Sequence, residues 1–74
     1  MNSLKDYETA AAYCKNSEIA AEMIAEELQE IAENKDVNRA AMGMLHAARE
    51  SFLQAASMLR LSADRLYSAI DRRE

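Results

Sequence analysis

Residues 41–69 read AMGMLHAARESFLQAASMLRLSADRLYSA, and no proline interrupts them. Small and large apolar side chains alternate through this stretch at steps of three and four residues. The predicted seam consists of Ala41, Leu45, Ala48, Phe52, Ala55, Leu59, Ser62, Leu66 and Ala69. Heptad spacing of this kind is typical of a long helix that packs against other helices. We therefore predict a helix over residues of about 37–72.

Another helix is predicted upstream, over residues of about 3–34. Its apolar residues follow helical spacing in two runs, which are Leu4, Tyr7, Ala11 and Cys14, then Ala21, Ile24, Leu28 and Ile31. Between these runs, the step through Ser17 slips the heptad by one residue. The slip indicates either a local overwinding or a break near Asn16.

Two long helices joined by a turn at residues 34–38 predict an all-α fold, an antiparallel helical hairpin that forms one domain over residues 1–74. Asn34, Asp36 and Asn38 indicate the turn, because asparagine is tolerated at a helix C-terminus and either Asp36 or Asn38 can cap the next helix. Gly43 argues against a continuous second helix, since glycine costs about 1 kcal/mol relative to alanine there. A break at Gly43 would give a three-helix variant, which ranks second because the seam keeps its phase across it.

The chain has more apolar surface than one hairpin can bury. A domain of 74 residues buries only about 60% of the surface of its unfolded chain. Further apolar lines flank the seam, one of them through Met44, Met58 and Leu61. We therefore expect a homodimer that closes a four-helix bundle. Seam periodicity is compatible with either relative direction of the two hairpins.

Six glutamates and no basic residue lie between Asn16 and Asn34. Like charges at i,i+4 each cost a few tenths of a kcal/mol, so a positive charge nearby should offset the repulsion. One interpretation is a solvated face that Arg49, Arg60 or Arg65 partly neutralises. The functional interpretation is a basic protein partner, attracted by electrostatic complementarity. The candidate partner-binding residues of this face are Glu18, Glu22, Glu26, Glu30 and Glu33.

Met44, Met58 and Leu61 are the candidate apolar contacts. Apolar side chains at helical spacing most often form core or a dimer interface. The alternative is a groove that docks a helix of a partner protein, since the flexible methionine side chain adapts to irregular surfaces.

No catalytic, cofactor-binding or metal-binding residue is predicted. His46 is the only histidine and lies one helical turn from Glu50, whereas a metal site in a helix bundle needs further inward ligands. Cys14 continues an apolar stripe, which favours a buried thiol over a nucleophile. We therefore expect neither an enzyme nor a cofactor.

Nucleic acid is not an expected partner. In architecture, the alternating seam resembles that of small plasmid RNA-binding proteins of the repressor-of-primer type, which are helical-hairpin dimers. An RNA-binding face needs lysine or arginine to neutralise phosphates. Residues 1–34 hold two lysines against eight acidic residues.

The remaining expectations concern location and function. No apolar stretch approaches the roughly 20 residues of a membrane span, no secretory signal is evident, and a lone cysteine suits a reducing compartment. We therefore expect a cytoplasmic protein that works through protein–protein binding, as an adaptor, inhibitor or chaperone-like subunit. The alternative is a purely structural assembly unit, and a metal-binding or enzymatic role ranks third.

Overall fold

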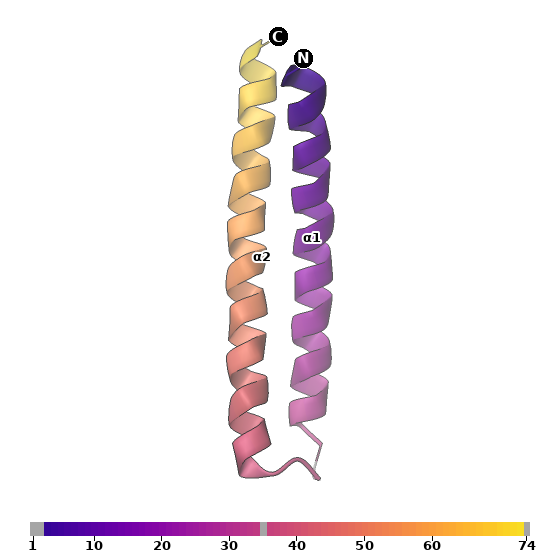
Figure 1. The fold of residues 1–74 in the computed structure, drawn as a ribbon, viewed down its shortest axis with the longest axis vertical. Helices are drawn as coiled ribbons and strands as arrows, with labels where there is room; N and C mark the ends of the chain where they lie inside the picture. Colours follow the sequence, from indigo (N-terminus) through magenta and orange to yellow (C-terminus); the bar gives the residue numbers. More distant parts are fainter. Residues whose placement is uncertain (1–2, 35, 74) are drawn as a thin grey trace.

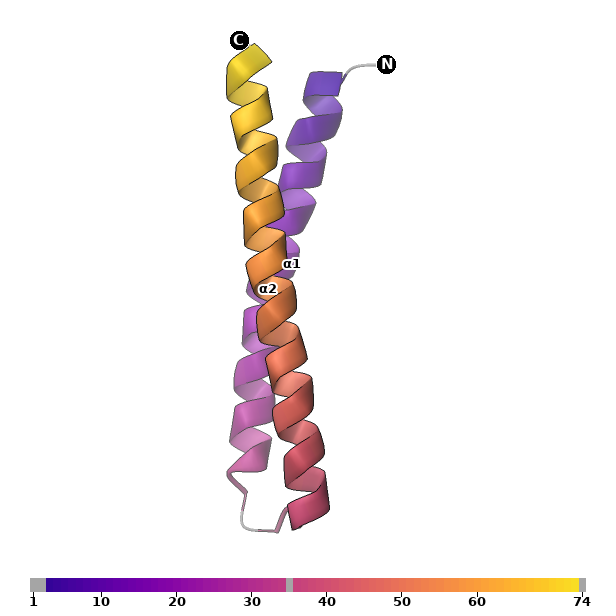
Figure 2. The same cartoon turned by 90° about the vertical axis from the view of Figure 1, so that its left-hand side faces the viewer.

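The computed structural model describes residues 3–34 and 36–73, which form two helices, α1 (Ser3–Ala32) and α2 (Arg39–Arg73). The helices are antiparallel and lie side by side, so that Ser3 and Arg73 are at the same end of the molecule (Figure 1). They cross at a shallow angle, as Figure 2 shows, and form a rod of 54 × 17 × 13 Å. The predicted all-α hairpin is confirmed.

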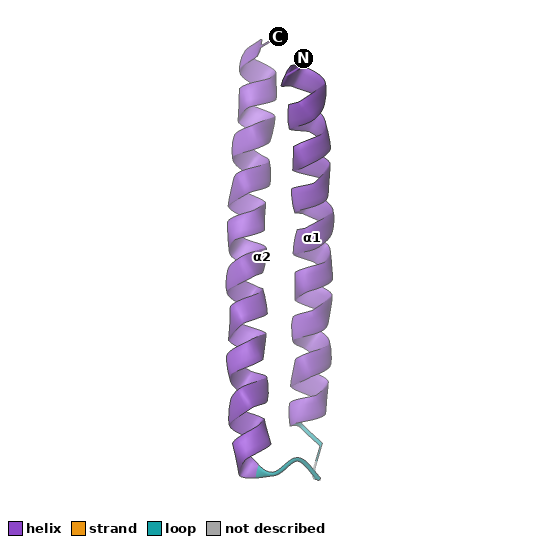
Figure 3. Ribbon diagram, in the orientation of Figure 1, coloured by secondary structure: helices purple, strands orange, loops and turns teal. Residues whose placement is uncertain are grey.

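The loop between the helices is longer than the sequence predicts, because each helix is shorter at its turn end. Helix α1 ends at Ala32 and α2 begins at Arg39, two residues inside each predicted limit; the loop between them is seen in Figure 3. Asn34 Oδ1 accepts a hydrogen bond from the Asp36 backbone N–H at 2.9 Å, an Asx turn that competes with helix continuation. Asn38 Oδ1 accepts from the Ala41 N–H at 2.8 Å, so Asn38 is the N-cap of α2. Within the predicted turn, residue 35 lies outside the described residues.

The heptad repeat of α1 continues without a slip. The apolar pattern fails only at residue 18, where the buried seam position is filled by the charged residue Glu18. The heptad positions a and d of α1 are filled by Leu4, Tyr7, Ala11, Cys14, Glu18, Ala21, Ala25, Leu28 and Ala32, all of them buried or half-buried. The predicted slip through Ser17 is therefore wrong, and α1 continues through Asn16. Ile24 and Ile31, which the sequence places in the seam, lie beside it and stay exposed.

In α2 the predicted seam is half right. Positions a and d are filled by Met42, Leu45, Arg49, Phe52, Ala56, Leu59, Ala63, Leu66 and Ile70, none of which is fully exposed. The four large residues at position d agree with the prediction. Ala55 and Ser62 are exposed, however, while the following residues Ala56 and Ala63 are buried. The small residues that face α1 are therefore Ala56 and Ala63, each one position after the predicted seam residue.

Alanine fills the centre of the interface between the helices. Among the described residues, the fully buried apolar side chains are Ala11, Ala21, Ala25, Ala32, Ala56 and Ala63, and no large side chain is fully buried. Alanine lets the two backbones approach closely, and the larger seam residues then flank the contact half-buried. The hairpin therefore has a narrow core with little buried apolar area.

We predict that Ala63→Leu lowers the free energy of unfolding by about 2 kcal/mol, because extra methyl and methylene groups have no room between closely packed helices. Ala63 is 1% exposed. The matched control is Ala47→Leu, at an exposed position of the same helix, where the change should stay within about 0.5 kcal/mol. Urea unfolding at one fixed protein concentration measures both. Equal effects of the two substitutions would contradict the observed seam.

Gly43 lies within the continuous helix α2 and faces open space, since a Cβ atom placed there would meet nothing within 4 Å. We predict that Gly43→Ala raises the free energy of unfolding by about 1 kcal/mol, the difference in helix propensity. The reverse substitution Ala47→Gly, also at an exposed site of α2, should lower it by a similar amount. A loss of stability in Gly43→Ala would show that another chain approaches the helix at this position.

Candidate functional site

A carboxylate is buried at the middle of the interface between the helices. Glu18 occupies position a of α1 and is 4% exposed. Its Oε2 accepts a hydrogen bond of 2.6 Å from Arg60 Nε of α2, and Arg60 Nη2 donates at 3.3 Å to Glu22 Oε2, one turn further along α1. Arg60 reaches these groups because helical side chains lean toward the N-terminus of their own helix, which in α2 is the turn.

The hydrogen bond from Arg60 lowers the pKa of Glu18 below its ordinary value of 4.5, against the opposing effect of burial. The nearby charges of Arg60 and Lys15 act in the same direction. In turn, the hydrogen bond to Glu18 raises the pKa of Arg60. Glu18 is thus held as an anion among the otherwise uncharged seam residues of α1.

One oxygen of the buried carboxylate is incompletely satisfied. Glu18 Oε1 has no hydrogen-bond partner among the described residues. Lys15 Nζ lies 3.7 Å away, which is an ion-pair distance but too long for a hydrogen bond. A half-satisfied buried group contributes little to net stability, so this cluster is better understood as a feature that selects one pairing of the helices.

The acidic face is smaller than predicted. Glu18 cannot display its charge to a partner, because the hairpin buries it; this corrects its predicted role. Of the three arginines considered for neutralising the face, Arg60 does so. The exposed residues Glu22, Glu26, Glu30 and Glu33 remain, and we call them the acidic surface.

Neutralisation of the acidic surface is incomplete. Glu22 contacts Arg60, and Gln29 Nε2 donates to Glu33 Oε2 at 3.1 Å. Within the described part of the chain, Glu26 and Glu30 form no ion pair. Among the described residues, therefore, no ion pair offsets the charges of Glu26 and Glu30 on the outer side of α1 near the turn.

The apolar candidates lie on two different sides of α2. Met44 and Met58, which are 76% and 63% exposed, occupy the same heptad position, c. Leu61, which is 44% exposed, occupies position f on the outer side of the helix. The three residues therefore do not form one continuous contact line.

One broad face of the hairpin carries no charge, and sequence reasoning missed it. In an antiparallel pair, position g of both helices lies on one face and position e on the other, as the Glu22–Arg60 contact between two e residues illustrates. Position e carries Glu8, Lys15, Glu22 and Arg60. Position g, which we call the charge-free face, consists of Ala10, Ser17, Ile24 and Ile31 of α1 and Ala41, Ala48, Ala55, Ser62 and Ala69 of α2. Counting charges by heptad position would have revealed it.

The other candidates for chemistry are not brought together. Cys14 is a free thiol, half-buried in the seam of α1, and His46 is exposed on α2. Within residues 3–34 and 36–73, no group of three His, Cys, Asp or Glu side chains could hold a metal ion. No helix in the described residues is long and apolar enough to cross a membrane.

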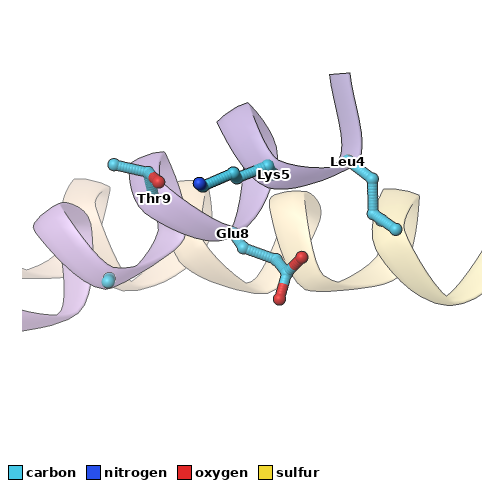
Figure 4. Close-up of a pocket in the computed structure, with 5 residues that line it drawn as sticks. Leu4, Lys5, Glu8 and Thr9 are labelled. Carbon is cyan, nitrogen blue, oxygen red and sulfur yellow. The ribbon is translucent and has the colours of Figure 1, made fainter. Parts of the chain in front are cut away.

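A shallow depression near the start of α1 is lined by Leu4, Lys5, Glu8, Thr9 and Ala12, all from this one helix. Figure 4 shows that the side chains of Lys5 and Glu8 point in different directions. The depression therefore has no set of polar groups aimed at a common ligand.

Comparisons of this chain with protein-family models, with curated proteins and with solved structures find no match.

We predict that Glu18→Gln destabilises the protein at neutral pH and that its difference from the wild type shrinks as the pH falls. Because the pKa of Glu18 is lower in the folded state than its ordinary value of 4.5, its contribution is complete above pH 4.5 and is lost as the pH falls through the folded value. Urea unfolding of both proteins between neutral pH and acid measures the difference. Glu30→Gln, at an exposed glutamate that forms no ion pair with any described residue, is the control for general charge effects. A difference independent of pH would contradict the assignment.

Proposed function

We propose that this protein is a non-enzymatic helical hairpin that acts through protein–protein binding as a homodimer, in the role of an adaptor, inhibitor or chaperone-like subunit. The supporting observation is the apolar side chains that the hairpin leaves exposed, among them Met44, Met58, Ile24 and Ile31. In a chain of 74 residues, such exposure is typical of a surface that another protein covers. The narrow alanine core makes the same cover important for stability.

The total exposed area supports association. The hairpin exposes 5712 Å², whereas a compact monomer of 8.3 kDa is expected to expose about 4,600 Å². The excess of about 1,100 Å² is larger than the roughly 800 Å² that each partner loses in an interface of standard size. Each hairpin therefore has enough surplus surface for a dimer contact.

We propose a basic protein as the further partner, recognised by the acidic surface. Glu26 and Glu30 have no neutralising neighbour among the described residues, and Glu33 accepts only a neutral donor. Attraction of a positively charged patch to this region would raise the association rate and would weaken with salt. The free thiol of Cys14 supports placing this function in the reducing environment of the cytoplasm.

The alternative is a purely structural assembly unit whose apolar faces serve only to join copies. The two proposals differ in whether the acidic surface has a partner. A basic protein that depends on Glu26, Glu30 and Glu33 supports the first proposal. A stable oligomer with no such partner supports the second.

We expect the triple substitution Glu26→Gln, Glu30→Gln and Glu33→Gln to abolish capture of a basic protein from the cytoplasm of the source cells. Capture by the wild-type protein should weaken about tenfold between about 0.01 M and 0.15 M salt. The matched control removes three negative charges elsewhere, by Asp6→Asn, Glu8→Gln and Asp71→Asn. Affinity capture followed by quantitative mass spectrometry compares the three proteins. Equal recovery by both variants would reject the acidic surface as the binding site.

A further inference from the structure

We propose that a second copy of this chain covers the charge-free face, with its turn at the opposite end of the rod. This inference rests on the homodimer proposed above and specifies the surface and direction of the contact. The charge-free face extends over most of both helices, from Ala10 to Ile31 in α1 and from Ala41 to Ala69 in α2. It is therefore long enough for two hairpins to pack along their length.

Charge selects this face over the opposite one. The face formed by position e carries Glu8, Lys15, Glu22 and Arg60, and burying these groups in a dimer would require removing their hydration. The charge-free face presents only alanine, serine and isoleucine. Covering the residues of position g removes apolar surface from water without burying a charged group.

The order of large and small side chains on the face is self-complementary. When two copies of α1 lie antiparallel about an axis near residue 20, Ile24 lies over Ser17 of the second copy and Ile31 over Ala10. About the same axis, Ala55 of α2 lies over its own counterpart. Residue 20 of α1 lies at about the level of Ala55 of α2, as the contacts of Arg60 with Glu18 and Glu22 indicate. One twofold axis between the two hairpins can therefore cross both the α1 contact and the α2 contact. A contact of this kind is isologous and closes as a dimer.

The charge distribution along the rod decides the direction of the second copy. The half next to the turn, residues 19–54, holds seven acidic and three basic residues, whereas the two segments that form the other half hold six of each. Two hairpins with their turns together would place two strongly negative halves side by side. With the turns at opposite ends, each negative half lies beside a neutral one, which lowers the repulsion.

The border of the face extends the contact. Tyr13 of α1 and Met44 and Met58 of α2 occupy position c, next to the charge-free face, and are 69%, 76% and 63% exposed. Position c also holds exposed charged residues, which would lie at the rim of the contact: Asp6, Glu27, Arg65 and Arg72. In the proposed dimer, Met58 lies over the small residue Ser51 of the second copy. The dimer thus covers Met44 and Met58, while Leu61 and the acidic surface stay outside it.

The first test compares two substitutions that add the same charge to the same helix. Ile24, on the charge-free face, and Ile19, on the other side of α1, are 41% and 51% exposed. We expect wild type and Ile19→Glu to have twice the mass of 8.3 kDa by light scattering after gel filtration. Ile24→Glu should weaken the dimer by at least about 100-fold, because symmetry places the charge in the interface twice. Circular dichroism reports whether each variant remains helical.

The outcomes separate this inference from the function it rests on. A dimer that survives Ile24→Glu but dissociates with Ile19→Glu would overturn the assigned face and leave the homodimer intact. A wild-type protein that stays monomeric at high concentration would overturn the homodimer itself. If Ile24→Glu unfolds rather than dissociates, the cross-linking test decides.

The second test uses cysteine cross-linking in a Cys14→Ser background, which removes the native thiol. Because Ala55 lies over its own counterpart in the proposed dimer, Ala55→Cys should form an intermolecular disulfide under a mild oxidant at least about tenfold faster than Ala47→Cys, on the outer side of α2. Failure of Ala55→Cys to cross-link faster than this control overturns the proposed contact. Cross-linking only in a mixture of Ser17→Cys and Ala55→Cys proteins would show the turns at the same end and overturn the direction.

Discussion

Close approach of the two helices is the constraint on which the rest of this structure depends. The positions buried between α1 and α2 hold alanine, so the backbones lie near each other and larger side chains cannot enter the contact. Those larger side chains are consequently arranged on the flanks, where the hairpin alone covers them only in part. The alanines at the buried positions thus explain both the close pairing of the two helices and the apolar surface that the hairpin leaves exposed.

The contact of Glu18 with Arg60 adds specificity to a seam that would otherwise tolerate several alignments. Alanine repeats every few residues in both helices, so a shift by one heptad would still place alanine against alanine. Such a shift would move the buried Glu18 carboxylate away from Arg60, whose Nε lies 2.6 Å from it. A buried anion without its cation is strongly unfavourable. The ion pair therefore penalises alignments that separate Glu18 from Arg60.

Much of the fold could be predicted from the sequence, because the large residues Leu45, Phe52, Leu59 and Leu66 recur at intervals of seven. Hydrophobicity does not distinguish Ala55 from Ala56, although only the second is buried; the side on which α1 packs makes the difference. Glu18 was assigned to the surface because its cation lies 42 residues away in the chain. Of the two candidate surfaces, only the acidic surface could be predicted from the sequence, because its residues are close together in one helix. The charge-free face combines residues of two helices and can be recognised only once the pairing of the helices is known.

Both helix ends away from the turn, at Ser3 and Arg73, lie at the same end of a rod that is 54 Å long (Figure 1). Any group joined to either of these two ends would therefore meet the rod at the end opposite the turn. In a dimer whose turns lie at opposite ends, the two attachment sites are at opposite poles. Groups joined to the free helix ends of the two copies would then be separated by roughly the length of one helix.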